Sequence, residues 1–67
     1  MTVDVRDMLC AQALAALARA LTPLARGDAV DVRYNAEDVK RDLLIFAKDR
    51  GHDTRVIGPD ALRMTKG

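Results

Sequence analysis

Apolar and polar positions change their spacing along the chain, and these changes divide its first half into a strand and a helix. Residues 2–6 alternate between apolar and polar side chains, which predicts a short strand with one buried face. From Cys10 onward, leucines recur every three or four residues among alanines, which predicts a helix. Pro23 disfavours helical geometry in the residue before it, so this helix should end near Leu21.

The second half of the chain repeats this change of spacing and then adds a hairpin signal. Residues 29–34 alternate again and predict a second strand. Residues 36–50 have helical spacing, with Asn35 as the expected N-cap and Gly51 as the expected C-cap. Beyond them, two extended segments flank a Gly-Pro-Asp turn and predict a hairpin.

The predicted order is therefore strand, helix, strand, helix, strand, strand, in one domain over residues 1–67. These elements can bury their apolar faces only if both helices pack on one side of a single sheet. We expect an α/β (α+β) two-layer sandwich, with a four-stranded mixed sheet and two helices on one face. The expected core includes Val3, Val5, Leu14, Leu17, Val30, Val32, Leu43, Phe46 and Val56.

Composition indicates that this core is thin. A chain of 67 residues buries roughly 60% of the surface that its unfolded form exposes. Eleven alanines supply much of the apolar content, and the larger apolar side chains are mostly aliphatic. One cysteine, Cys10, and one histidine, His52, provide neither a disulfide nor a metal site within the chain.

The charge balance bears on partners and compartment. Eleven Lys and Arg residues are interspersed with ten Asp and Glu residues, for a net charge of +1, so no broad basic face for nucleic acid is indicated. No apolar run approaches the ~18 residues of a membrane span, and the N-terminus lacks the pattern of a signal peptide. Because an unpaired cysteine fits a reducing compartment, we expect a cytoplasmic protein.

Cys10 is the one strong nucleophile, and it opens the first predicted helix. Unpaired amides and the helix dipole at such a position favour an anion and lower a thiol pKa, whereas the nearby carboxylate of Asp7 opposes a second negative charge. If the sulfur faces solvent, we expect the thiol pKa to lie below its ordinary value despite Asp7. The alternative is that Cys10 is a small buried apolar side chain. A cysteine-protease arrangement has little support because no base is placed by the sequence, and a thioredoxin-like cycle lacks a second cysteine.

Three further sets of polar residues could bind a partner or a ligand. Arg19 lies on the first helix above Cys10, so it is either a partner contact or a solvated arginine. Arg41 and Asp42 form either a binding pair or part of a solvated helix face. His52, with a single cysteine, does not make a zinc site, and a capping or strand-edge role is favoured.

Several short motifs together resemble the TusA/SirA-like family of small sulfur-carrier proteins. That family has a first strand, a Cys-Pro-x-Pro motif opening a helix, a Gly-Glu turn, an Arg-Asp pair in the second helix and a Gly-His before the third strand. The resemblance covers nearly the whole chain. The matching positions are Asp4, Arg6, Cys10, Gly27-Asp28, Arg41-Asp42, Gly51-His52 and Lys66-Gly67.

The resemblance implies a two-layer α/β sandwich similar to the C-terminal domain of the third bacterial translation initiation factor. It implies that Cys10 is the catalytic residue of a sulfurtransferase-like carrier. Cys10 would accept sulfane sulfur as a persulfide from a cysteine desulfurase or rhodanese-type donor, and pass it to a thiol of an acceptor protein. Such a carrier needs no cofactor, and Asp7, Gln12 and Arg19 are candidates for partner binding.

The chain departs from the family at the motif itself. Cys-Pro-x-Pro is replaced by Cys10-Ala11-Gln12-Ala13, and Asp7 stands where the family usually has glycine. The alanines keep the helix and restore two amide donors that proline lacks. The alternative function is therefore a non-catalytic interaction or regulatory module of the same fold, in which Cys10 is structural.

Overall fold

The computed structural model describes residues 1–67 and contains the six predicted elements in the predicted order. They are β1 (Thr2–Asp4), α1 (Cys10–Leu21), β2 (Ala29–Arg33), α2 (Glu37–Arg50), β3 (Asp53–Gly58) and β4 (Ala61–Thr65). The helix α1 ends at Leu21, as Pro23 predicts. Gly51 adopts the left-handed conformation of a C-cap at the end of α2, with a φ of 75°. Neither helix is long and apolar enough to cross a membrane.

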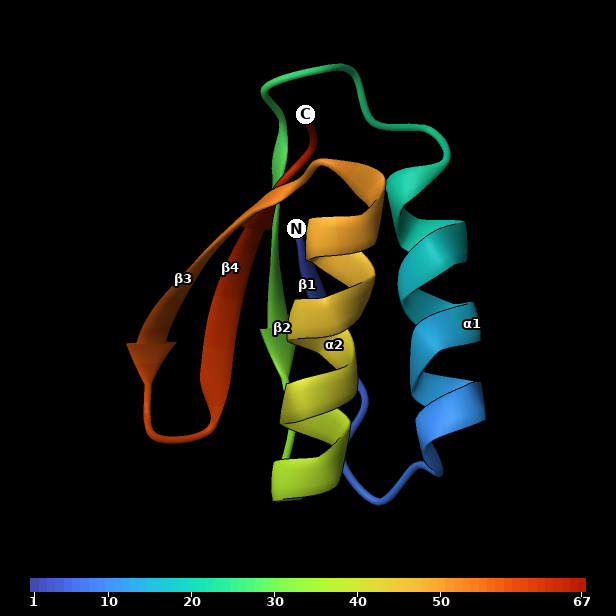
Figure 1. The fold of residues 1–67 in the computed structure, drawn as a ribbon, viewed down its shortest axis with the longest axis vertical. Coiled ribbons are helices and arrows are strands. Elements are labelled where there is room, and N and C mark those ends of the chain that lie inside the picture. The colour runs from blue at the N-terminus through green and yellow to red at the C-terminus, as the bar shows by residue number, and fades with distance from the viewer.

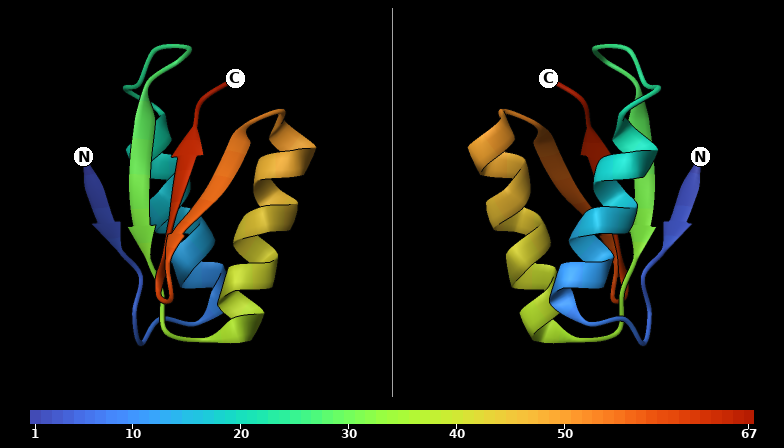
Figure 2. Two further views of the ribbon diagram at one scale, coloured as in Figure 1. Left: turned by 90° about the vertical axis from the view of Figure 1, so that its left-hand side faces the viewer. Right: turned by 90° about the vertical axis from the view of Figure 1, so that its right-hand side faces the viewer.

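The four strands form one mixed sheet in the order β1-β2-β4-β3 (Figure 1). The pair β1/β2 is parallel, and the β2/β4 and β4/β3 pairs are antiparallel. Both helices lie on the same face of this sheet, side by side (Figure 2). The predicted two-layer sandwich is therefore confirmed, because the crossover between the parallel strands places α1 on the face that α2 also covers.

The core lies between the sheet and the two helices. The register pairs Val30 with Met64 and Val32 with Leu62, so all four side chains point to the helix layer, and all four are fully buried. Leu17 of α1 and Leu43 of α2 close the core from the other side, also fully buried, while Ala13, Ala20 and Ala47 let the helices approach. The core is thin and aliphatic, as composition predicts.

One predicted core residue, Val56, is exposed. Its register partner is Leu62, so Val56 lies on the helix-facing side of the sheet, yet 54% of its surface is accessible. The β3–β4 hairpin extends to one side beyond α2 (Figure 1), so α2 contacts β3 without covering Val56. Phe46, Val3 and Leu14 are only partly buried and pack against the rim of the core. The other predicted core residues are buried.

Tyr34, the residue after β2, has a buried hydroxyl group that leads to a stability prediction. Its side chain is 3% exposed, and its hydroxyl group has no hydrogen-bond partner. A buried hydroxyl group without a partner loses its hydration on folding and gains nothing in return. We expect Tyr34→Phe to raise the free energy of unfolding by about 1 kcal/mol, as measured by urea denaturation. A variant that is less stable than the wild type would show that the hydroxyl group is hydrogen-bonded in solution.

Candidate functional site

Cys10 is the first residue of α1 and follows directly on the β1–α1 loop. The residue before it, Leu9, is 73% exposed, and Met8 is also exposed although both are large and apolar. Cys10 itself is partly buried and packs against the edge of the core. The thiol therefore lies at one end of the two-helix layer, beside a loop that presents apolar side chains to solvent.

The helix begins at Cys10 without the prolines of the family motif, because Gln12 takes over part of the capping. The backbone N–H of Leu9 donates to Oε1 of Gln12 at 3.1 Å, which is the half of a capping box that the third helical residue provides. Gln12 is thus held by the start of α1 while its side chain remains exposed. Sequence reasoning placed Gln12 among the partner-binding candidates and missed this capping contact.

Two carboxylates of α2 face the Cys10 thiol. The two helices begin at the same end of the molecule (Figure 1), so the first turns of α2 lie beside the first residue of α1. The Sγ atom donates to Oδ2 of Asp38 at 3.9 Å. Asp42 follows Asp38 by one helical turn and therefore lies on the same side of α2.

These carboxylates raise the pKa of the Cys10 thiol above its ordinary value. The largest cause is a hydrogen bond to the carboxylate of Asp42, followed by partial burial of the sulfur and by the negative charges of Asp42 and Asp38. A thiol has one proton and donates to one carboxylate at a time, so the two aspartates are alternative acceptors. Sγ lies 3.9 Å from Oδ2 of Asp38, and both carboxylates disfavour a thiolate. The expected lowering of the pKa by the helix N-terminus is therefore wrong.

Asp7 is not the carboxylate that acts on Cys10, because Asp7 is engaged elsewhere. Its backbone N–H donates to Oδ1 of Asn35 at 3.0 Å, and its Oδ1 accepts from Nδ2 of Asn35 at 2.8 Å. Asn35 consequently does not cap α2, whose N-cap is Ala36 without a side-chain hydrogen bond. Asp7 has a φ of 63°, a conformation that Asp and Asn tolerate better than most residues. This pair ties the loop before α1 to the loop before α2.

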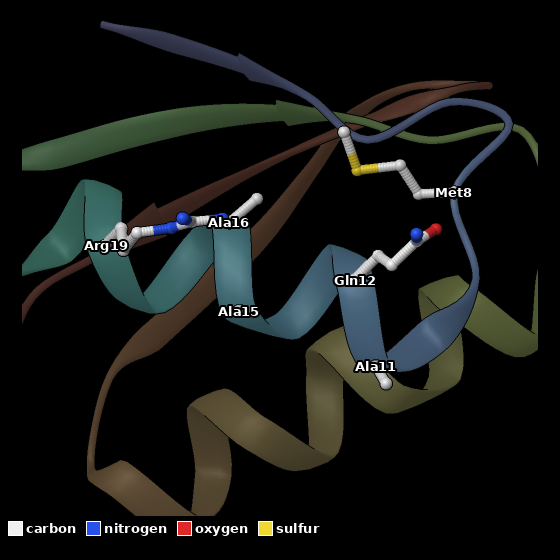
Figure 3. Close-up of a pocket in the computed structure, with 6 residues that line it drawn as sticks. All are labelled: Met8, Ala11, Gln12, Ala15, Ala16 and Arg19. Atoms are coloured by element: carbon white, nitrogen blue, oxygen red, sulfur yellow. The ribbon is translucent and has the colours of Figure 1, made fainter.

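An open groove of about 470 Å³ runs along the solvent-facing side of α1 (Figure 3). We call it the α1 groove. It brings together two of the predicted partner-binding residues, Gln12 and Arg19, but neither Asp7 nor Cys10 lines it. Four of the six lining residues are apolar, and Arg19 is the only charged one. The lining residues are Met8, Ala11, Gln12, Ala15, Ala16 and Arg19.

The remaining candidates lie elsewhere. Arg41 is an exposed side chain whose Nε lies 4.0 Å from Oδ1 of Asp42, which is a loose ion pair. Nδ1 of His52 accepts from the backbone N–H of Gly67 at 3.1 Å, and its ring lies beside Phe46. No group of three or more His, Cys, Asp or Glu side chains is arranged to hold a metal ion. His52 thus lies between the end of α2 and β3, where its backbone N–H donates to the carbonyl oxygen of Ala47 and its ring accepts from the C-terminal residue.

A comparison with protein-family models matches this chain to a known family. The family is described as "Sulfurtransferase TusA", and its model matches residues 1–65. No curated protein and no solved structure matches the chain significantly. The match spans all six elements, including the start of α1, where Cys10 lies.

Proposed function

Because the chain belongs to the TusA sulfurtransferase family, whose general role is to carry sulfur, we propose that Cys10 relays sulfane sulfur between two proteins. The donor is a cysteine desulfurase or a rhodanese-type enzyme that holds a persulfide. The acceptor is a protein with a reactive thiol. The observation that supports this role is the position of the single cysteine, at the first residue of α1 and beside the exposed Met8–Leu9 loop.

The transfer needs only thiol chemistry. Cys10 first loses its proton to water and attacks the outer sulfur of the donor persulfide as a thiolate. The S–S bond of the donor breaks, and the donor cysteine leaves as a thiolate that takes a proton back from water. Cys10 then holds the persulfide, and an acceptor thiolate attacks its outer sulfur in the same way. No electrons are gained or lost overall, so the carrier itself requires no cofactor.

The α1 groove supports docking of the donor and the acceptor. Its apolar floor of three alanines and Met8 lets another protein approach the helix closely, and Arg19 provides one unpaired positive charge at its far end. Small apolar side chains around one charged residue fit a partner with an apolar contact and a carboxylate. We place the carrier in the cytoplasm, where a single cysteine stays reduced.

The proposal is tested by loading the protein with sulfur. After incubation with a cysteine desulfurase and cysteine, the intact mass of the wild type should increase by one sulfur atom, and a reductant should remove it. Cys10→Ser should show no increase while it keeps the circular dichroism spectrum of the folded protein. Equal loading of Cys10→Ser and the wild type would refute Cys10 as the carrier residue.

One observation favours the alternative, a non-catalytic module in which Cys10 is structural. The thiol is partly buried, and its pKa is raised rather than lowered. If this alternative holds, the wild type gains no sulfur from a desulfurase that loads another carrier in the same assay. Cys10→Ser would then lower the free energy of unfolding, because a polar hydroxyl group replaces a thiol packed at the edge of the core.

A further inference from the structure

The strand β3 is an open edge of the sheet. It pairs with β4 on one side and has no neighbouring strand on the other. All side chains from Asp53 to Ile57 are exposed, on both faces of the sheet, although α2 contacts part of this strand. An edge of this kind presents free backbone N–H and C=O groups to any other strand that can align with it.

The charges on β3 are unpaired within the chain. Thr54 and Val56 align with the buried Met64 and Leu62, so these two positions face the helices. Asp53 and Arg55 alternate with them and therefore lie on the outer face of the sheet, away from the helices. Arg55 lies directly opposite Arg63, which is itself paired with Asp31 at 2.8 Å. Like charges opposite each other are unfavourable, and neither Asp53 nor Arg55 forms an ion pair in the chain.

We propose that β3 pairs with β3 of a second copy of this chain, antiparallel and about a two-fold axis at Thr54. In this register each Asp53 lies opposite the partner's Arg55, and the two Thr54 side chains lie opposite each other. Two opposite-charge pairs then form on the outer face, and each Arg55 gains the carboxylate that its own chain does not supply.

Other registers lack this complementarity. Residues opposite each other in a continuous sheet point to the same face. The two-fold axis must therefore pass through a residue and not between two residues, so each alternative register places the axis at another residue of β3. An axis at Arg55 places two arginines opposite each other. An axis at Val56 places each Arg55 opposite the partner's Ile57 and leaves Asp53 without an opposite charge. The charge pattern therefore selects the axis at Thr54.

The proposed interface lies away from the candidate sulfur-carrying residue. The strand β3 is at the opposite edge of the sheet from β1, whereas α1 packs over β1 and β2 (Figure 2). Two copies joined at β3 would thus leave both α1 grooves and both Cys10 residues free. The dimer does not depend on the proposed function, and it would present two carrier sites on one sheet.

Sedimentation equilibrium with charge variants tests the pairing. We expect the wild type to show concentration-dependent dimerisation, and each of Asp53→Arg and Arg55→Asp to be monomeric over the same range. An equimolar mixture of these two variants should dimerise, because each chain then meets only opposite charges. The double variant Asp53→Arg/Arg55→Asp should dimerise like the wild type. A wild type that stays monomeric, or variants and mixtures that all behave alike, would overturn the proposal.

Cross-linking tests the register. In the Cys10→Ser background, Thr54→Cys should form an intermolecular disulfide under mild oxidation, because cysteines opposite each other across antiparallel strands come within reach. Thr2→Cys, on the opposite edge of the sheet, is the matched control and should remain a thiol. Equal cross-linking of the two variants would show random collision and contradict the proposed register.

Discussion

Leu43→Ala should leave a large part of the protein unfolded at room temperature. Leu43 is fully buried at the centre of the α2 face that packs on the sheet. Removing a buried leucine side chain costs about 3 kcal/mol, through lost burial and the cavity that remains. A chain of this size has about 3–10 kcal/mol in total, and no disulfide adds to it here. Urea denaturation followed by circular dichroism measures the loss.

Two neighbouring positions on α2 provide the controls. Ile45 is 51% exposed, so Ile45→Ala should change the free energy of unfolding by about 0.5 kcal/mol or less. Phe46 is larger than Leu43 but only partly buried, with the guanidinium group of Arg50 over its ring, so Phe46→Ala should cost less than Leu43→Ala. If Phe46→Ala were the more damaging change, α2 would be rotated relative to its position in this structure.

Asp38→Asn/Asp42→Asn should make Cys10 react several-fold faster with iodoacetamide at pH 7. The thiolate is the reacting species, and the two carboxylates raise the pKa of the thiol, so they reduce the thiolate fraction at neutral pH. Removing both negative charges lowers that pKa and increases the thiolate fraction. The thiolate fraction rises tenfold for each unit by which the pKa falls, as long as the pH stays below the pKa. The reaction rate rises by a smaller factor, because a thiolate of lower pKa is a weaker nucleophile.

The pH dependence separates this effect from a change in exposure of the sulfur. At a pH above the thiol pKa of both proteins the thiolate fraction is complete, so the two rates should converge there. Asp42→Asn alone should accelerate the reaction more than Asp38→Asn alone, because Asp42 contributes more than Asp38 to the raised pKa of the thiol. Glu37→Gln removes an exposed carboxylate from the same turn of α2 and should leave the rate unchanged. A double variant that reacts at the wild-type rate at every pH would contradict the assignment.

The fold could be predicted from the sequence because each element carries its own local signal. Alanine and leucine at helical spacing, ended by Pro23, predict α1 with the bounds that the structure shows. Alternation likewise places Val56 on the helix-facing side of β3, and this side is correct. Alternation does not reveal whether a helix covers that side. Coverage depends on the position of two helices over four strands, so the exposure of Val56 was not predictable from local pattern.

The candidate site could be predicted only as far as it is local. The position of Cys10 at the start of a helix follows from the chain around it. The carboxylates of Asp38 and Asp42 come from another helix, and their approach requires that both helices begin at the same end of the sandwich. The predicted order already contains that arrangement, and two aspartates four residues apart in the second helix were the available signal. The wrong sign of the pKa shift results from weighing only the helix that contains Cys10 and the loop before it, and not the carboxylates of α2.

The reciprocal hydrogen bonds between Asp7 and Asn35 have a consequence for how motion at this end of the molecule can be observed. They join two loops separated by 28 residues, and the segment between them contains all of α1 and β2. The Asp7 amide can exchange its hydrogen with solvent only when these loops separate, since its acceptor is a side chain of the other loop. The exchange rate of this one amide therefore reports the local opening of the end that holds Cys10, independently of global unfolding.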